Sequence, residues 1–360
     1  MGKDSEFYKG KRRDQTLRLR ELLTRLPGFA VDYIHSKDVS TQISTRISYA
    51  YDLITFFEYM LNIASSVFKN KYSSITEFRL DDIEKFTSED IIEYQRYLEL
   101  NVEENGKYHE NGKKSIARKM APLRGLYEYH YLHKSIHENP MLLVPLPRLK
   151  KDKNIIRMDN QEVRDILNAV EHTIAGSTER QKKALERTKH RDLAILTLML
   201  NTGIRVSELN GLDLTDVDLR ANTLVIVRKG GGQDVLYFND TVHDALEEYI
   251  DGERKLINPR EGQEKALFFS THGNRISVDA VEKLVKKYAR VAVPNKKITP
   301  HKLRSTYGTA LYRETGDIRL VADVLGHENV NTTIDYYAAI EDEHKRAARN
   351  AVDFNRKDVT

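Results

Sequence analysis

The sequence predicts a mainly α-helical protein of two domains, the second of which carries one small antiparallel β-sheet. The chain has 360 residues, more than one hydrophobic core usually organises, so two domains are expected. Apolar residues recur at helical spacing along most of the chain, whereas residues 222–240 place β-branched runs on both sides of a glycine-rich turn. Three of the eight prolines fall in residues 139–154 and interrupt the helical pattern.

Composition limits the classes of site that the protein can hold. The 58 Lys and Arg residues against 54 Asp and Glu leave a net charge of +4, so total charge alone barely indicates a polyanionic partner. The absence of cysteine excludes disulfides, thiol nucleophiles and thiolate metal sites, and it is compatible with a reducing cytosol. No stretch approaches the roughly 18 apolar residues of a membrane span. We therefore expect a soluble, cytoplasmic protein with no membrane association.

Residues 1–40 form a basic segment with leucines at helical intervals. Lys11, Arg12 and Arg13 belong to a run of six Lys and Arg residues that precedes Glu21. The run is either a basic arm along DNA phosphates or the solvated face of a first helix, and the sequence does not distinguish the two.

Residues 41–145 are predicted to form a helical domain. From about Thr41 the apolar positions gather on one helical stripe, which is typical of a core face. The stripe consists of Tyr49, Leu53, Phe56, Phe57 and Met60. Thr87 and Asp90 form a capping-box-like start for a further helix.

Basic and aromatic side chains are interleaved in residues 115–134. Arg118, Lys119 and Arg124 alternate with tyrosines, a mixture that suits a nucleic-acid surface. Tyrosines half buried in a small helical bundle would give the same pattern, so both interpretations stay open. A proline- and lysine-rich linker, residues 146–156, follows; it contains Lys150 and Lys151.

Residues 157–360 are predicted to form the second domain. Asp159 and Glu162 provide a capping-box-like start for its first helix. An apolar helix, a glycine turn and a second helix follow, and residues 222–240 then read as a β-hairpin. The remainder returns to helical patterning.

Two local patterns in this domain offer cationic groups. Arg205, in "TGIRVSEL", follows a glycine turn that feeds a helix, so its guanidinium could sit at an anion site near backbone N–H groups. An ordinary ion pair with Glu208, one turn on, is an equally good interpretation. Lys229, in "VRKGGGQD", lies at the hairpin tip, where three glycines permit close approach to another surface; taken alone it indicates a flexible turn.

Two further patterns add histidines. His301 and Arg304, in "HKLRSTYGT", are three residues apart and therefore share a helical face; a salt-bridged surface pair is the plainer interpretation. In "VLGHENVNTT", Gly326 reads as the residue that ends a helix, which puts His327 in a turn between two helices. A lone histidine there is usually structural.

Together these groups suit one kind of chemistry. Two arginines, a lysine, two histidines and a downstream tyrosine are hydrogen-bond donors, and no clustered carboxylates accompany them to hold Mg²⁺. Such a set can stabilise a pentacoordinate phosphate, with arginines on the non-bridging oxygens. A lysine or histidine can protonate a leaving oxygen, and a tyrosine can attack phosphorus.

In order and spacing, "TGIRVSEL", "RKGGG", "HKLR", "LGH" and "TTIDYY" resemble the motifs of the tyrosine recombinase, or phage integrase, family. The resemblance spans about residues 155–345. Residues 41–145 are consistent with the helical core-binding domain of that family in length, position and helical character. The resemblance implies a two-domain clamp around double-stranded DNA, with the linker crossing one side of the duplex.

Carried over by residue, the resemblance implies that Arg205 and Arg304 bind the scissile phosphate. Lys229 would protonate the 5′ leaving oxygen, and Glu208 would brace the site from behind. His301 and His327 would assist proton transfer and hydrogen-bond the phosphate.

The resemblance also implies a tyrosine nucleophile that forms a 3′-phosphotyrosine link. Because that ester keeps the bond energy, no ATP and no metal are expected. Two strand exchanges through a Holliday junction need four active sites, hence a homotetramer on two DNA sites; accessory DNA-bending proteins are compatible with this scheme. The DNA target, and the choice among integration, excision, inversion and dimer resolution, are not readable from the sequence.

Two adjacent tyrosines compete for the role of nucleophile. Tyr336 and Tyr337 point about 100° apart on a helix, and helical geometry does not choose between them. The family commonly places its nucleophile nine residues after the histidine of the Gly-His motif, in a pattern like Thr-Thr-x-x-Tyr. Tyr336 fits both the spacing from His327 and "TTIDY", so we predict Tyr336, with Tyr337 as the alternative.

Two other functions are weighed against recombination. A type IB topoisomerase shares the phosphotyrosine chemistry but acts as a monomer; residues 341–354, an amphipathic tail that could dock on a neighbouring subunit, argue against it. The same tail could instead fold back on its own domain. A non-catalytic DNA-binding protein of the same fold would be indicated by the loss of a catalytic group, and all six are present.

Overall fold

The computed structural model divides the chain into two compact units, Asp4–Lys151 and, with residues 1–3, Asp152–Thr360. It describes residues 6–64, 66–102, 106, 108–148, 157–175, 178–228 and 230–326. We call them the N-terminal unit and the C-terminal unit.

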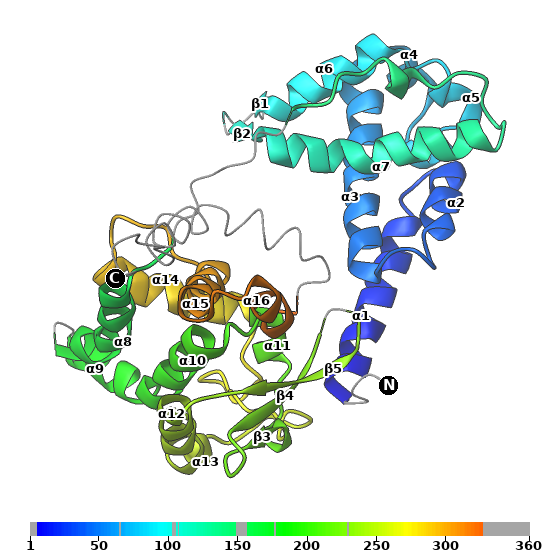
Figure 1. Cartoon of the computed structure of the whole chain (residues 1–360). Coiled ribbons are helices and arrows are strands. Elements are labelled where there is room, and N and C mark those ends of the chain that lie inside the picture. The colour runs from blue at the N-terminus through cyan, green and yellow to red at the C-terminus, as the bar shows by residue number, and fades with distance from the viewer. Residues whose placement is uncertain are drawn as a thin grey trace, which may run out of the picture. The chain divides into compact units, whose positions relative to one another are not determined.

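The N-terminal unit is almost entirely helical (Figure 1). Its helices are α1 (Glu6–Leu23), α2 (Gly28–Ser36), α3 (Ile43–Tyr59), α4 (Ser66–Lys71), α5 (Leu80–Ile83), α6 (Ser88–Glu99) and α7 (Lys113–Leu132). A π turn, Met60–Ala64, extends α3, and 3-10 turns occupy Ile75–Glu77 and Pro140–Leu142. Two short antiparallel strands, β1 (Leu100–Val102) and β2 (Tyr108–Glu110), join α6 to α7.

The predicted apolar stripe forms the centre of this unit. Leu53, Phe56, Phe57 and Met60 are buried on α3 and its π extension, and Tyr49 packs at the edge of the same core. The predicted start of α6 is confirmed: Thr87 Oγ1 accepts from the Asp90 N–H at 3.2 Å, and the Asp90 carboxylate accepts from the Thr87 N–H at 2.8 Å. Thr87 and Asp90 lie within one turn of helix, so the sequence alone is enough to predict this helix start.

Two features of the N-terminal unit differ from the sequence-based picture. Residues 6–40, set apart above as a basic segment, form α1 and α2 within the same compact unit, and α1 buries Leu19 and Leu22 in the common core. The β1–β2 pair was also not predicted. Its strands have three residues each, and every residue of β2 is exposed, so no apolar alternation marks them.

The C-terminal unit is a helical assembly with one small sheet (Figure 1). Its helices are α8 (Asn160–Ala175), α9 (Glu179–Glu186), α10 (Lys189–Thr202), α11 (Val206–Asn210), α12 (Asp240–Asp251), α13 (Glu253–Leu256), α14 (Val278–Ala292), α15 (Pro300–Thr315) and α16 (Ile318–Val324). The strands β3 (Val217–Asp218), β4 (Thr223–Val227) and β5 (Gln233–Tyr237) form an antiparallel sheet in the order β3-β4-β5.

Helix α10 is the central element of this unit, and it packs against α8, α12 and α15. All its residues from Ala194 to Leu200 are buried, which explains why its sequence is apolar on every side. The predicted hairpin is confirmed, with β4 and β5 in register from Thr223 opposite Tyr237 to Val227 opposite Gln233. The predicted start of α8 is confirmed too: Asp159 and Glu162 exchange two backbone-to-carboxylate hydrogen bonds of 2.8 Å.

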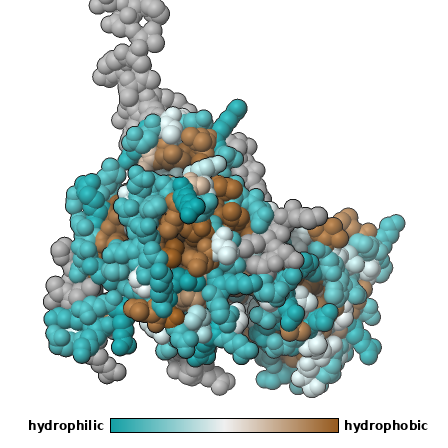
Figure 2. Space-filling model, turned by 90° about the horizontal axis from the view of Figure 1, so that it is seen from below, coloured by the Kyte–Doolittle hydropathy of each residue, from teal (hydrophilic) through white to brown (hydrophobic). Residues whose placement is uncertain are grey.

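Hydrophilic side chains cover most of the face shown in Figure 2, and apolar residues appear there as separate patches. Isolated exposed apolar side chains are normal for a folded domain. Within the described ranges, no helix combines the length and the apolar character needed to cross a lipid bilayer.

Candidate active site

The turn between α10 and α11 presents Arg205. Helix α10 ends at Thr202 and is capped by Gly203, whose φ of 63° favours glycine. A Cβ at Gly203 would lie 2.6 Å from Tyr307 Cδ1 and 2.8 Å from Leu325 Cδ2, so the turn packs closely against α15 and the end of α16. Arg205 then occupies the N-cap position of α11.

Arg205 and Glu208 form the ion pair that the sequence allowed. The Glu208 carboxylate accepts from the Arg205 backbone N–H at 2.9 Å and from its Nη1 at 2.7 Å. The Glu208 side chain is 2% exposed, whereas that of Arg205 is 28% exposed. The buried carboxylate thus orients a guanidinium that stays accessible from solvent, so the ion pair and an anion site are compatible.

Arg304 lies on α15 and is buried. Its Nη1 donates to the Gly203 carbonyl at 2.5 Å, and its Nη2 donates to the Leu325 carbonyl. The side chain therefore joins the turn that precedes Arg205 to the end of α16.

Like that of Arg304, the guanidiniums of Arg205 and Arg228 donate to carbonyls at the end of α16. Arg205 Nη2 donates to the Gly326 carbonyl at 2.7 Å, and Arg228 Nη2 donates to the Val324 carbonyl at 2.9 Å. With Arg304 on Leu325, three arginines engage three consecutive carbonyls. Carbonyls at a helix C-terminus lack intrahelical partners and carry partial negative charge, so they suit cationic donors. We call Arg205, Arg228 and Arg304 the arginine cluster.

Sequence reasoning missed Arg228. The residue follows β4 directly, and in the alternation of that strand it shares the inward side with the buried Leu224 and Ile226. Its side chain is only 12% exposed. An arginine at an inward position of a hairpin is the signal that could have found it.

His301 lies in the first turn of α15, three residues before Arg304. The ring keeps contact with solvent, but desolvation by the surrounding protein lowers its pKa, and the charges of Arg304, Lys302 and Arg205 lower it further. The imidazole is therefore neutral at neutral pH and can accept a proton.

Four predicted catalytic residues, Lys229, His327, Tyr336 and Tyr337, lie outside the described residues. For Lys229 and His327, the residue that precedes each in the sequence is described. Arg228 directly precedes Lys229 and Gly326 directly precedes His327, and both neighbours belong to the arginine cluster or contact it. The structure thus brings together Arg205, Glu208, Arg304 and His301 with the sequence positions that adjoin Lys229 and His327.

The predicted DNA-binding residues fall into three groups. Lys11, Arg12 and Arg13 are exposed on α1. Arg118 Nη1 lies 2.8 Å from the buried Asp52 carboxylate and Lys119 Nζ lies 3.6 Å from it, so both support the fold, while Arg124 is exposed. Lys150 and Lys151 lie outside the described residues.

Helix α1 adds two basic residues, Lys9 and Arg20, to the predicted Arg12 and Arg13. Lys9, Arg12, Arg13 and Arg20 line one shallow depression together with Thr16 and Leu17. The concentration of positive charge on one helical face suits a polyanion.

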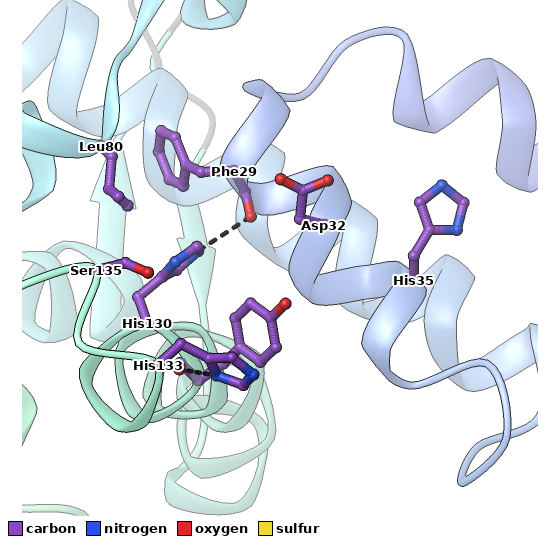
Figure 3. A pocket seen from close by; sticks show the side chains of 8 residues that line it. Phe29, Asp32, His35, Leu80, His130, His133 and Ser135 are labelled. Carbon is purple, nitrogen blue, oxygen red and sulfur yellow. Dashed lines mark hydrogen bonds between the residues drawn. The ribbon is translucent and has the colours of Figure 1, made fainter.

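A cavity of about 370 Å³ in the N-terminal unit holds three histidines (Figure 3). His130 donates from Nε2 to the Phe29 carbonyl at 3.1 Å, and His133 donates from Nδ1 to the Tyr129 carbonyl at 2.7 Å. Burial lowers the pKa of His130, which keeps its ring neutral. No described group of three or more His, Asp and Glu side chains is placed to hold a metal ion. Hydrogen bonding to the backbone gives His130 and His133 a structural role.

Comparisons with known proteins show the family to which the chain belongs. Residues 157–344 match the model of the phage integrase family. The chain belongs to this family, and it is a tyrosine-type site-specific recombinase that cleaves and rejoins DNA strands.

Two relatives cover most of the chain. It is 34% identical over 315 residues to tyrosine recombinase XerC of Caldanaerobacter subterraneus subsp. tengcongensis, which covers 85% of this chain and 81% of that protein. It is 29% identical over 354 residues to tyrosine recombinase XerS of Streptococcus uberis, covering 92% and 97% respectively.

Solved structures share the fold. The integrase of transposon Tn1549 in complex with transposon right end DNA matches with a TM-score of 0.61 at 19% identity, covering 90% of this chain and 98% of that one. The XerH recombinase bound to palindromic difH, in a post-cleavage complex, matches with a TM-score of 0.60 at 17% identity, covering 93% and 94%. The expected mainly helical, two-domain fold is confirmed.

Proposed function

We propose that Arg205 and Arg304 hold the scissile phosphate while Tyr336 attacks phosphorus. The observation that carries this proposal is the meeting of the two guanidiniums, from α11 and α15, on the adjacent carbonyls of Leu325 and Gly326. Two arginines fixed side by side can stabilise the charge that builds on the non-bridging oxygens in the transition state.

As the bond between the Tyr336 oxygen and phosphorus forms, the bond from phosphorus to the 5′ oxygen breaks. Lys229 gives a proton to that oxygen, and His301, whose lowered pKa keeps it neutral, and His327 assist the loss of the phenolic proton and hydrogen-bond the phosphate. A free 5′-hydroxyl and a 3′-phosphotyrosine result, and reversal with a new 5′-hydroxyl rejoins the strand.

The substrate in this proposal is double-stranded DNA. The Tn1549 integrase and XerH structures are complexes with DNA, and the basic depression on α1 offers phosphate contacts. A homotetramer on two DNA sites supplies the four active sites that two strand exchanges need, and accessory DNA-bending proteins are compatible with it. Because the phosphotyrosine ester retains the bond energy, the reaction needs neither ATP nor a metal.

The test is capture of the covalent intermediate. A duplex that binds the protein is selected from a random-sequence library, and a set of versions is prepared with the nick moved one nucleotide at a time, so that the short released fragment diffuses away. In EDTA and without ATP, we expect protein-linked DNA on a denaturing gel. Absence of the link from every nicked version of a duplex that is demonstrably bound would refute the catalytic proposal.

Added Mg²⁺ and ATP tell whether a cofactor is needed. If the covalent protein–DNA link appears only when Mg²⁺ or ATP is added, the proposal that no cofactor is needed is wrong, and the proposed catalytic residues are unaffected. Relaxation of a supercoiled plasmid lacking the selected sequence would instead favour the topoisomerase alternative, which the relatives described above do not support.

A further inference from the structure

We propose that Arg228 is a positioning residue that fixes the hairpin carrying Lys229 against the Arg205–Glu208 pair and the end of α16. This inference rests on the proposed role of Lys229 as the proton donor to the 5′ oxygen. It assigns to Arg228 no contact with DNA.

Few contacts among the described residues hold the tip of the hairpin in place. The strand register ends at Val227 opposite Gln233. The loop is closed by the Arg228 N–H donating to the Gly232 carbonyl at 2.8 Å and the Gly231 N–H donating to the Arg228 carbonyl at 3.0 Å. No described atom lies within 4 Å of a Cβ built on Gly230, Gly231 or Gly232. The three glycine positions of the tip therefore face open space among the described residues, whereas the Arg228 side chain makes several contacts.

The Arg228 side chain contacts three elements at once. Within its own hairpin, Nε and Nη2 lie 2.9 and 2.8 Å from Asp234 Oδ2. Its Nη1 lies 3.4 Å from Glu208 Oε1, on α11, and its Nη2 donates to the Val324 carbonyl, on α16. These are the elements that carry or adjoin Lys229, Arg205 and His327 in the sequence.

Gly326 adds a steric constraint on the same guanidinium. A Cβ on Gly326 would lie 2.7 Å from Arg228 Nε and 2.8 Å from its Cζ, so the guanidinium rests against the backbone of Gly326. A planar group with five donors in a fixed fork can bond in three directions at once, which a lysine ammonium on a flexible stem does not reproduce.

Loss of the Arg228 side-chain contacts should impair one step, the protonation of the leaving oxygen. A small displacement of a catalytic group is costly because the reacting atoms must be aligned. Loss of these contacts should leave the hold of Arg304 on the phosphate intact, because Arg304 bonds to Gly203 and Leu325 without Arg228.

The experiment compares two leaving groups. The duplex selected above is made with the scissile 5′ oxygen, or with sulfur in its place. A thiol has a pKa of about 8.5, far below that of an alcohol, so the thiolate leaves without receiving a proton. If a variant's only defect is proton delivery, its cleavage rate returns to that of wild type on the sulfur substrate. If its phosphate site is weakened, the cleavage rate stays low on both substrates.

Single-turnover cleavage is measured for wild type, Arg228→Met, Arg228→Lys and Asp234→Asn, with DNA affinity measured in parallel. Arg220→Met, an exposed arginine in the turn before β4, is the matched control. We expect Arg228→Met to cleave the oxygen substrate about 10- to 100-fold more slowly, less than the roughly 10²- to 10⁴-fold contribution of a positioned acid because Lys229 is displaced and not removed. The sulfur substrate should be cleaved within about threefold of wild type. Arg228→Lys and Asp234→Asn should follow the same pattern more weakly.

Equal slowing of Arg228→Met on both substrates, or no slowing on either, overturns the inference. If Arg228→Met does not fold, Arg228→Lys and Asp234→Asn decide instead. The same comparison is made: each variant's cleavage rate relative to wild type on the oxygen substrate and on the sulfur substrate. Lys229→Ala separates the inference from its premise: if sulfur fails to restore Lys229→Ala, the proposed proton donor is wrong. If sulfur restores Lys229→Ala but not the Arg228 variants, only the positioning role is wrong.

Discussion

The carboxylate of Glu208 joins two arginines: its Oε1 lies 2.7 Å from Nη1 of Arg205 and 3.4 Å from Nη1 of Arg228. A buried carboxylate with two cationic partners fixes both guanidiniums, and its removal leaves Arg205 without this partner and Arg228 with Asp234 as its one described carboxylate partner. This single side chain therefore links the proposed phosphate-binding arginine to the proposed hairpin brace.

Glu208→Gln should slow covalent cleavage while leaving DNA affinity nearly unchanged, because the residue is buried and lies behind the phosphate site. The expected loss in single-turnover rate is about 10- to 100-fold, the range for a lost hydrogen bond to a charged group. Glu261→Gln, a change at an exposed position, is the control and should cleave at the wild-type rate. Equal rates for the two variants would contradict the linking role of Glu208.

Gly326→Ala should impair cleavage more than its backbone strain explains. Gly326 and Gly316 both end helices at positive φ, 56° and 64°. A Cβ on Gly316 meets no described atom within 4 Å, whereas one on Gly326 meets the guanidinium of Arg228. Both alanine variants should lose about 1–2 kcal/mol of stability from left-handed strain, measured by thermal unfolding. Only Gly326→Ala should also cleave at least about tenfold more slowly, because Arg228 must move from its partners.

The comparison of Gly326→Ala with Gly316→Ala separates the two effects. If both variants lose the same cleavage activity, strain alone is responsible and the contact with Arg228 has no catalytic consequence.

The sequence predicts contacts between residues that are close together in the chain better than contacts between distant residues. Asp159 with Glu162, and Thr87 with Asp90, lie within one helical turn, and the structure confirms both caps. The convergence of Arg205 with Arg304 requires the folding of separate helices, and residue spacing alone left it open. The set of cationic residue types indicated that the two could share one phosphate, and the resemblance to tyrosine recombinases assigned them to the scissile phosphate.

Arg228 shows where sequence reasoning ended. Its partners Glu208 and Val324 lie 20 and 96 positions away, and its neighbours in "RKGGG" read as an ordinary flexible turn. The resemblance placed attention on Lys229, the next residue. The inward position of Arg228 on β4 becomes informative only once the strand alternation is extended by one residue beyond Val227.

The choice between the two tyrosines stays a prediction, since both lie outside the described residues. Tyr336→Phe should abolish the covalent link to DNA because it removes the phenolic oxygen that attacks phosphorus. Tyr337→Phe should retain linkage, because a helical neighbour points about 100° away. Linkage that survives in Tyr336→Phe and is lost in Tyr337→Phe would reverse the assignment, and both variants should keep wild-type affinity for the duplex.

Stability of the N-terminal unit should depend on Asp82 and on pH. The Asp82 side chain is 1% exposed. It accepts hydrogen bonds from Tyr72 Oη at 2.7 Å and the Arg79 N–H at 2.8 Å, and Lys71 Nζ lies 2.9 Å away. Burial alone would raise its pKa, but these partners together with Lys85 outweigh burial and lower the pKa to about 2.

A carboxyl whose pKa is about 3.9 unfolded and lower when folded stabilises the folded state above pH 4, and the stabilisation is lost as pH falls from about 4 to about 2. After screening of the lysines, which are exposed to solvent, we expect Asp82→Asn to cost on the order of 1 to 2 kcal/mol at pH 7. Hydrogen exchange of amides in residues 66–99 measures the cost locally. Asp81→Asn, at the exposed neighbouring position, should change little. The Asp82→Asn cost should stay constant from pH 7 to 5 and shrink below about pH 4; a cost that grows as the solution is acidified would contradict the lowered pKa.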